Sequence, residues 1–83
     1  MMYFVYILQC ADDTLYTGIT TDLNRRINEH NGAKEGARYT KTRQPVALKY
    51  SEQHETKSEA LKREIEIKSW PREKKLNLIG ESR

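Results

Sequence analysis

The chain has 83 residues, of which 33% are charged and 36% hydrophobic, and its net charge is +3. This length predicts one domain with a small core. The lack of a long apolar run or of a signal peptide argues against a membrane protein and predicts a soluble cytoplasmic one. Cys10 is the only cysteine, which excludes an internal disulfide, and two distant histidines argue against a structural zinc site.

The first twenty residues predict a β-hairpin. Residues 3–10 and 14–19 are rich in β-branched and aromatic side chains, and the Asp-rich segment 11–13 separates them. Gly18 stands late in the second strand, where glycine typically marks a bulge or a close approach to the backbone.

Two tyrosines occupy this hairpin. Tyr6 lies in the middle of the first strand, and Tyr16 lies two residues before Gly18 in the second. Their side chains share one face of the sheet only if Tyr16 pairs with an even-numbered residue such as Leu8. A loop with an odd number of residues produces that register.

A helix is predicted over residues 23–31. Thr20, Thr21 or Asp22 can cap its start, and Gly32 fits its end. A spacing of 3.6 residues places two apolar side chains on one helix face together with a cation and a histidine. These four residues are Leu23, Arg26, Ile27 and His30.

Residues 33–44 are predicted to form a basic loop, and residues 46–51 a third strand. Val46, Leu48 and Tyr50 alternate with polar or small residues, which indicates one buried face. The segment from residue 33 to residue 49 contains five basic residues and one acidic residue. Such a surface suits a phosphate backbone, and an ordinary solvated face is the alternative.

Thr56 and Glu59 have the spacing of a capping box, which predicts a helix from there to about Ser69. Pro71 interrupts that helix and can start a short final one over residues 71–78. We therefore expect an α+β domain over residues 1–80, with a short tail at 81–83. Its three-stranded antiparallel sheet would follow the order of the sequence, with helices packed around it.

Glu64 is out of place in the long helix. Its position lies near the middle of the helix's apolar direction. A carboxylate aimed at the core costs several kcal/mol unless it is paired or binds a metal. A structural ion pair and a functional carboxylate are both open interpretations.

The ordered set of these motifs resembles the GIY-YIG nuclease superfamily, in particular its small stand-alone (UPF0213-like) members. Phe4-Val5-Tyr6 corresponds to the first motif, with Phe4 where the family name has glycine, and Tyr16-Thr17-Gly18 corresponds to the second. The segment 22–27 followed by His30 is similar to the family's helix, with its arginine at Arg26. The segment 58–64 is similar to the metal-binding segment, with its glutamate at Glu64.

The resemblance implies an endonuclease that hydrolyses phosphodiester bonds with one divalent cation. Glu64 would hold Mg²⁺ or Mn²⁺, Arg26 would bind the scissile phosphate, and His30 would bind phosphate or relay a proton. Tyr16 is the first choice for the general base, with Tyr6 positioning the water or the phosphate. The reverse assignment of the tyrosines stays open, and Gly18 would support the site structurally.

Nucleic acid is the expected partner, DNA more than RNA, and a separate protein could supply targeting. The residues expected to contact it are Arg25, Arg38, Lys41 and Arg43. A nucleic-acid-binding module without turnover and a protein-interaction domain are the alternative functions.

Overall fold

Three strands form an antiparallel sheet in the computed structural model, which describes residues 1–32, 40 and 43–80. They are β1 (Tyr3–Gln9), β2 (Leu15–Thr20) and β3 (Ala47–His54). Most of the predicted basic loop and the predicted tail at 81–83 lie outside the described residues. The hairpin and the α+β class are confirmed.

The predicted strand order is wrong, because β1 lies in the centre and the order is β2-β1-β3. Four successive residues of β1, from Val5 to Leu8, are buried. Such a run requires cover on both faces of the sheet and a neighbour on each side. The chain between β2 and β3 is long enough to carry β3 across to the free edge of β1.

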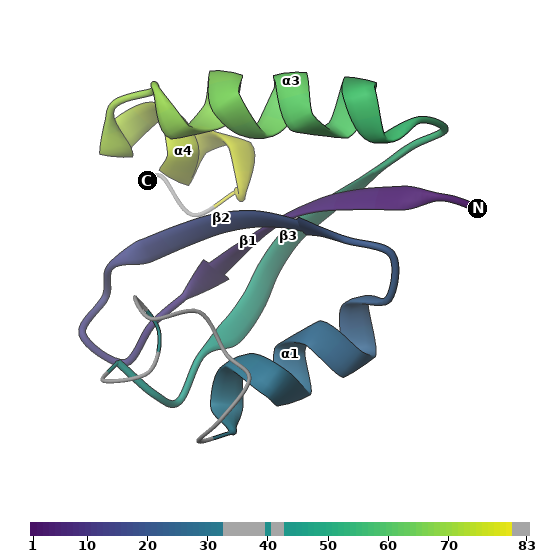
Figure 1. Ribbon diagram of the computed structural model, residues 1–83. Coiled ribbons are helices and arrows are strands. Elements are labelled where there is room, and N and C mark those ends of the chain that lie inside the picture. Colours follow the sequence, from purple (N-terminus) through teal and green to yellow (C-terminus); the bar gives the residue numbers. More distant parts are fainter. Residues whose placement is uncertain (33–39, 41–42, 81–83) are drawn as a thin grey trace.

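Helices cover both faces of this sheet (Figure 1). On one face, α1 (Leu23–Asn31) contributes Leu23 and Ile27 to a cluster with Tyr6 and Leu8. On the other face, Ala60 and Ile67 of α3 (Lys57–Lys68) pack with Val5 and Ile7. The short α4 (Arg72–Leu78) follows α3 and adds Leu78 to the same cluster. Alternate residues of β1 therefore serve two separate cores.

The predicted helix starts are confirmed by their caps. Asp22 Oδ1 accepts the backbone N–H of Arg25 at 3.1 Å, and Thr56 Oγ1 accepts that of Glu59 at 3.1 Å. Each bond satisfies one of the amide groups that a helix start leaves without a partner within the helix. The starts of the two helices that carry candidate site residues are thus set by capping hydrogen bonds within three residues of the cap.

The third strand departs from its predicted pattern. The pairing steps from Ile7–Tyr50 to Leu8–Leu48, so that Lys49 is the extra residue of a β-bulge. A bulge reverses which face successive side chains occupy. Val46 therefore packs in the α1-side cluster and Tyr50 in the α3-side cluster, whereas Leu48 is exposed. The prediction of one common buried face for these residues is wrong.

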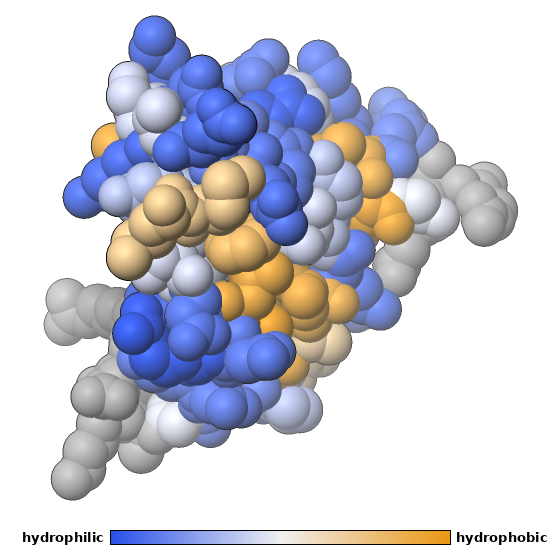
Figure 2. Space-filling view, turned by 90° about the vertical axis from the view of Figure 1, so that its right-hand side faces the viewer, coloured by the Kyte–Doolittle hydropathy of each residue, from blue (hydrophilic) through white to orange (hydrophobic). Residues whose placement is uncertain are grey.

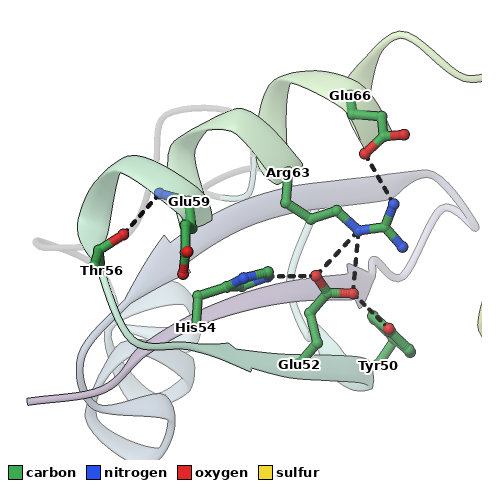
Figure 3. Close-up of polar contacts among 7 residues, drawn as sticks. All are labelled: Tyr50, Glu52, His54, Thr56, Glu59, Arg63 and Glu66. Atoms are coloured by element: carbon green, nitrogen blue, oxygen red, sulfur yellow. Dashed lines mark hydrogen bonds and ion pairs between the residues drawn. The ribbon is translucent and has the colours of Figure 1, made fainter.

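Beyond the bulge, β3 carries a polar network that ties it to α3 (Figure 3). The Glu52 carboxylate accepts hydrogen bonds from Tyr50 Oη at 2.6 Å, His54 Nε2 at 2.6 Å and Arg63 Nε at 3.0 Å. Arg63 also reaches Glu66 of its own helix at 3.0 Å. Arg63 is the donor that comes from α3, so its ion pair with Glu52 links that helix to β3.

The surface is mainly hydrophilic, and in Figure 2 an apolar band runs between two hydrophilic regions. Five large hydrophobic side chains in the described part of the chain are notably exposed: Met1, Met2, Leu48, Leu61 and Ile65. Among the residues that the structure describes, none forms a helix long and apolar enough to span a bilayer.

Candidate active site

The hairpin register places both tyrosines on the α1 face. Tyr16 pairs with Leu8 and Gly18 pairs with Tyr6, as the condition on an even-numbered partner required. The two rings lie with their centroids 6.4 Å apart at an interplanar angle of 42°. Tyr6 is 1% exposed, whereas Tyr16, on the edge strand, is half-buried.

Gly18 makes room for the Tyr6 ring. A Cβ atom at position 18 would lie 2.5 Å from Tyr6 Oη and 2.7 Å from its Cζ. It would also lie 3.2 Å from Cε2 of Tyr16. The predicted close approach at this glycine is confirmed, and the approaching group is the phenol of the neighbouring strand.

His30 lies beneath the two phenols at the end of α1. Its ring centroid is 5.9 Å from that of Tyr6 and 5.0 Å from that of Tyr16. Its Nε2 is 2.9 Å from Tyr6 Oη, and its Nδ1 is 2.8 Å from Oγ1 of Thr40. The imidazole is 0% exposed, so the phenol and the threonine hydroxyl hold both ring nitrogens.

Burial sets the charge of this histidine. It lowers the pKa of His30 to about 4, and the positive charge of Arg26 acts in the same direction. At neutral pH the ring is uncharged, with one N–H donor and one acceptor nitrogen. One of its two hydroxyl partners must therefore donate to the ring, and the other must accept from it.

Arg26 brings a guanidinium to the same cluster. Its Nη1 donates to Oε1 of Glu29 at 2.8 Å, one turn further along α1. Burial lowers the pKa of Arg26, but hydrogen bonds to Glu29 and Tyr6 outweigh that effect and raise it. The side chain is 27% exposed, so this cation reaches both the buried phenol and the solvent.

Tyr6 stays protonated in this setting. Burial raises the pKa of Tyr6 to about 12, although the hydrogen bond to Arg26 pulls it down. Tyr16 and Glu64 also raise it through their charges. Glu64 is therefore within electrostatic reach of the phenol.

Glu64 approaches the site from the other layer. It belongs to α3, on the opposite face from Tyr6, and its side chain is 16% exposed. Its Oε2 lies 3.3 Å from Nζ of Lys68. Lys68 in turn lines a groove of about 280 Å³ together with Tyr16. The predicted phenols, guanidinium and imidazole lie together on the α1 face. The predicted carboxylate lies in the opposite layer, paired with Lys68, and acts on Tyr6 through its charge.

Of the four residues predicted to contact nucleic acid, the structure describes Arg25 and Arg43. Arg25 is exposed and pairs with Glu29 at 3.7 Å. Arg43 pairs with Asp12 at 3.0 Å, near the hairpin loop. Arg38 and Lys41 lie outside the described residues.

Sequence reasoning missed Lys68 and Lys75, which line the groove beside Tyr16. They belong to helices of mixed charge, where a lysine is usually part of a solvated face. Only the packing of α4 against α3 brings them to one place, so no local signal could have singled them out.

The donor set fits a hydrated divalent cation rather than a cage of protein ligands. Within residues 1–32, 40 and 43–80, no three His, Cys, Asp or Glu side chains converge as a metal cluster. Mg²⁺ typically keeps several waters and takes one or two carboxylates plus substrate phosphates. Glu64, half-buried near the groove, can supply such a carboxylate if Lys68 moves aside.

Comparison with known proteins shows the family to which the chain belongs. Residues 2–77 match the GIY-YIG catalytic domain. A UPF0213 protein of Staphylococcus aureus is 58% identical over 79 residues, which are 95% of both chains. The solution structure of a UPF0213 protein from Bacillus halodurans is 43% identical, with a TM-score of 0.61 over 95% of this chain and 83% of that one. A solution structure from E. faecalis is 38% identical, with a TM-score of 0.64 over 93% and 81%. The chain therefore belongs to the GIY-YIG family of nuclease domains.

Proposed function

We propose that this protein is an endonuclease that hydrolyses phosphodiester bonds in nucleic acid, DNA more than RNA, with one divalent cation. The observation that carries the proposal is the cluster of Tyr6, His30, Arg26 and Tyr16 on the α1 face of the sheet. Membership of a nuclease domain family supports it. Hydrolysis needs an activated water and positive charge beside the phosphate, and this cluster offers groups for both.

Tyr16 is the proposed general base. In its ionised phenolate form it would take a proton from water as the water oxygen attacks phosphorus and the bond to the leaving oxygen breaks. Tyr16 is half-buried and lines the groove, so solvent reaches this residue. Tyr6 does not suit this role, because a phenol with a pKa of about 12 is ionised in roughly one molecule in a hundred thousand at pH 7.

Tyr6 and His30 are proposed to position the reacting groups. A protonated Tyr6 can donate a hydrogen bond to the water or to a phosphate oxygen. His30 is fully buried and uncharged, which suits holding that phenol better than binding an anion. We therefore do not propose phosphate binding for His30, which is one of the two roles that the resemblance implies.

Arg26 and Glu64 are proposed to balance the charge of the substrate. The Arg26 guanidinium, partly exposed beside Tyr6, would contact the scissile phosphate. Glu64 would hold the divalent cation, Mg²⁺ or Mn²⁺. When bound, that cation would neutralise charge that develops on the leaving oxygen.

Cleavage of labelled single-stranded, branched and duplex DNA in Mn²⁺ tests the proposal. Tyr16→Phe removes the proton acceptor but keeps the ring, so the cleavage rate should fall at least about 100-fold. Glu64→Gln should also abolish cleavage. Tyr3→Phe is the matched control, since it removes a phenol from the α3 side of the sheet and should leave the rate unchanged.

Two results would count against the proposal. If Tyr16→Phe cleaves as fast as the unmodified protein, Tyr16 is not the base. If no substrate is cleaved but DNA binding weakens with salt, the protein is a binding module on a nuclease fold.

A further inference from the structure

A groove runs along the outer edge of the sheet, away from the α1 helix. Leu15, Tyr16 and Thr17 of β2 form one side, and Lys68 and Lys75 form the other. Lys68 lies at the end of α3, and Lys75 lies in α4. The packing of Leu15, Trp70 and Leu78 in one cluster holds the two helices against this strand. The position of the two ammonium groups thus follows from the core beneath them.

The groove has an excess of positive charge. The charge of Lys68 is balanced by Glu64, at 3.3 Å. In the part of the chain that the structure describes, no acidic side chain forms an ion pair with Lys75. One positive charge therefore stays uncompensated beside the hydroxyl-bearing side chains of Tyr16 and Thr17. An anion with one negative charge matches this environment.

The groove also adjoins the candidate active site, because Tyr16 belongs to both. Its ring contacts His30, and the same residue lines the groove. A phosphate held by Arg26 and a second anion in the groove would both lie beside this residue, as two phosphates of one nucleic-acid strand can.

We infer that Lys68 and Lys75 form a binding site for a backbone phosphate that neighbours the scissile phosphate. The strand would pass around the β2 edge, from the α1 face to the α3 and α4 side. This inference rests on the proposed function, since it takes nucleic acid as the ligand. The helix dipole also stabilises lysines near the C-terminal end of a helix. That effect does not explain why both lysines line the same groove.

Fluorescence anisotropy with a labelled single-stranded DNA oligonucleotide, in EDTA and over a range of salt, tests the site. Each phosphate contact contributes about 0.7 to the slope of log K against log salt for single strands. Because the two lysines bind one phosphate, Lys75→Gln should reduce the slope by about 0.7, and adding Lys68→Gln should not reduce it further. Lys75→Arg should keep the slope of the unmodified protein.

Lys62→Gln is the matched control. It removes the same charge from an exposed position of α3 that does not line the groove. Far-UV circular dichroism and thermal unfolding show whether each variant is folded. The inference is overturned if Lys75→Gln and Lys62→Gln change the slope equally, or if the unmodified protein shows no salt-dependent binding.

The test separates this site from the proposed reaction. Because binding is measured without metal, a protein that never cleaves DNA can still show slopes that depend on Lys75. That result would reject the hydrolysis and support the groove. Normal cleavage together with slopes that ignore both lysines would reject the groove alone.

Discussion

At the scale of single residues, Gly18 sets the position of the Tyr6 phenol. In Gly18→Ala the added methyl group would collide with Tyr6 Oη and Cζ, which lie within 2.7 Å of the new atom. The ring is buried against His30 and cannot withdraw freely. We expect a loss of about 1–3 kcal/mol in the free energy of unfolding, measured by urea denaturation.

Gly32→Ala is the control for that substitution. Its new Cβ would meet backbone oxygens at 3.4 Å and 3.5 Å, which requires little movement. A stability of Gly18→Ala equal to that of Gly32→Ala would show that the Tyr6 ring is not confined.

His30 should make the fold sensitive to acid. Its pKa is about 4 in the folded chain, against 6.5 for an unperturbed histidine, so the unfolded chain binds the proton more strongly. The stability gained from the buried neutral ring is present above pH 6.5 and is lost as the pH falls to 4. The loss should reach about 3 kcal/mol, measured by urea denaturation at several pH values.

His30→Asn should be less stable at neutral pH and should lack most of the dependence between pH 6.5 and 4. His54→Gln, which removes the other histidine, should keep it. Burial raises the pKa of Glu52, but its hydrogen bonds outweigh that effect and lower it. Its contribution therefore fades at lower pH and is retained in His30→Asn. Equal pH dependence in His30→Asn and the unmodified protein would contradict the assignment.

At the scale of elements, the Glu52 network adds a polar link between α3 and β3 (Figure 3). Glu52→Gln keeps the size of the side chain but removes the less exposed of the two carboxylates that pair with Arg63. We expect a loss of about 1–3 kcal/mol, measured by thermal or urea unfolding.

Glu66→Gln is the matched control, since it removes the other carboxylate that contacts Arg63. Glu66 is 56% exposed, so its ion pair should contribute no more than about 0.5 kcal/mol. Equal losses in the two variants would show that the network does not fasten the helix.

At the scale of the whole molecule, the fold should not depend on a metal. The described residues contain no three-ligand cluster, so EDTA should abolish cleavage without lowering Tm. Added Mn²⁺ should raise Tm, because an ion that binds the folded state stabilises it. Glu64→Gln should remove that increase. A Tm that falls in EDTA would show instead that a metal supports the fold.

Much of this organisation could be predicted from local pattern. The caps at Asp22 and Thr56 and the close approach at Gly18 follow from chemistry within a few residues of each position. The even-numbered partner of Tyr16 follows from the alternation of side chains along a strand. These features need no knowledge of distant contacts.

Other features depend on how the elements pack. The central place of β1, the bulge at Lys49 and the groove between β2 and the last helices join segments that are far apart in the chain. The sequence by itself determined the elements, their caps and the residues that resemble a nuclease site, because these depend on short-range periodicity and hydrogen bonding. Only the tertiary structure decided which strand lies in the centre, which layer holds Glu64, and that Lys68 and Lys75 lie beside Tyr16. The physical reason is that two separate cores are buried against one strand, and their packing sets those positions.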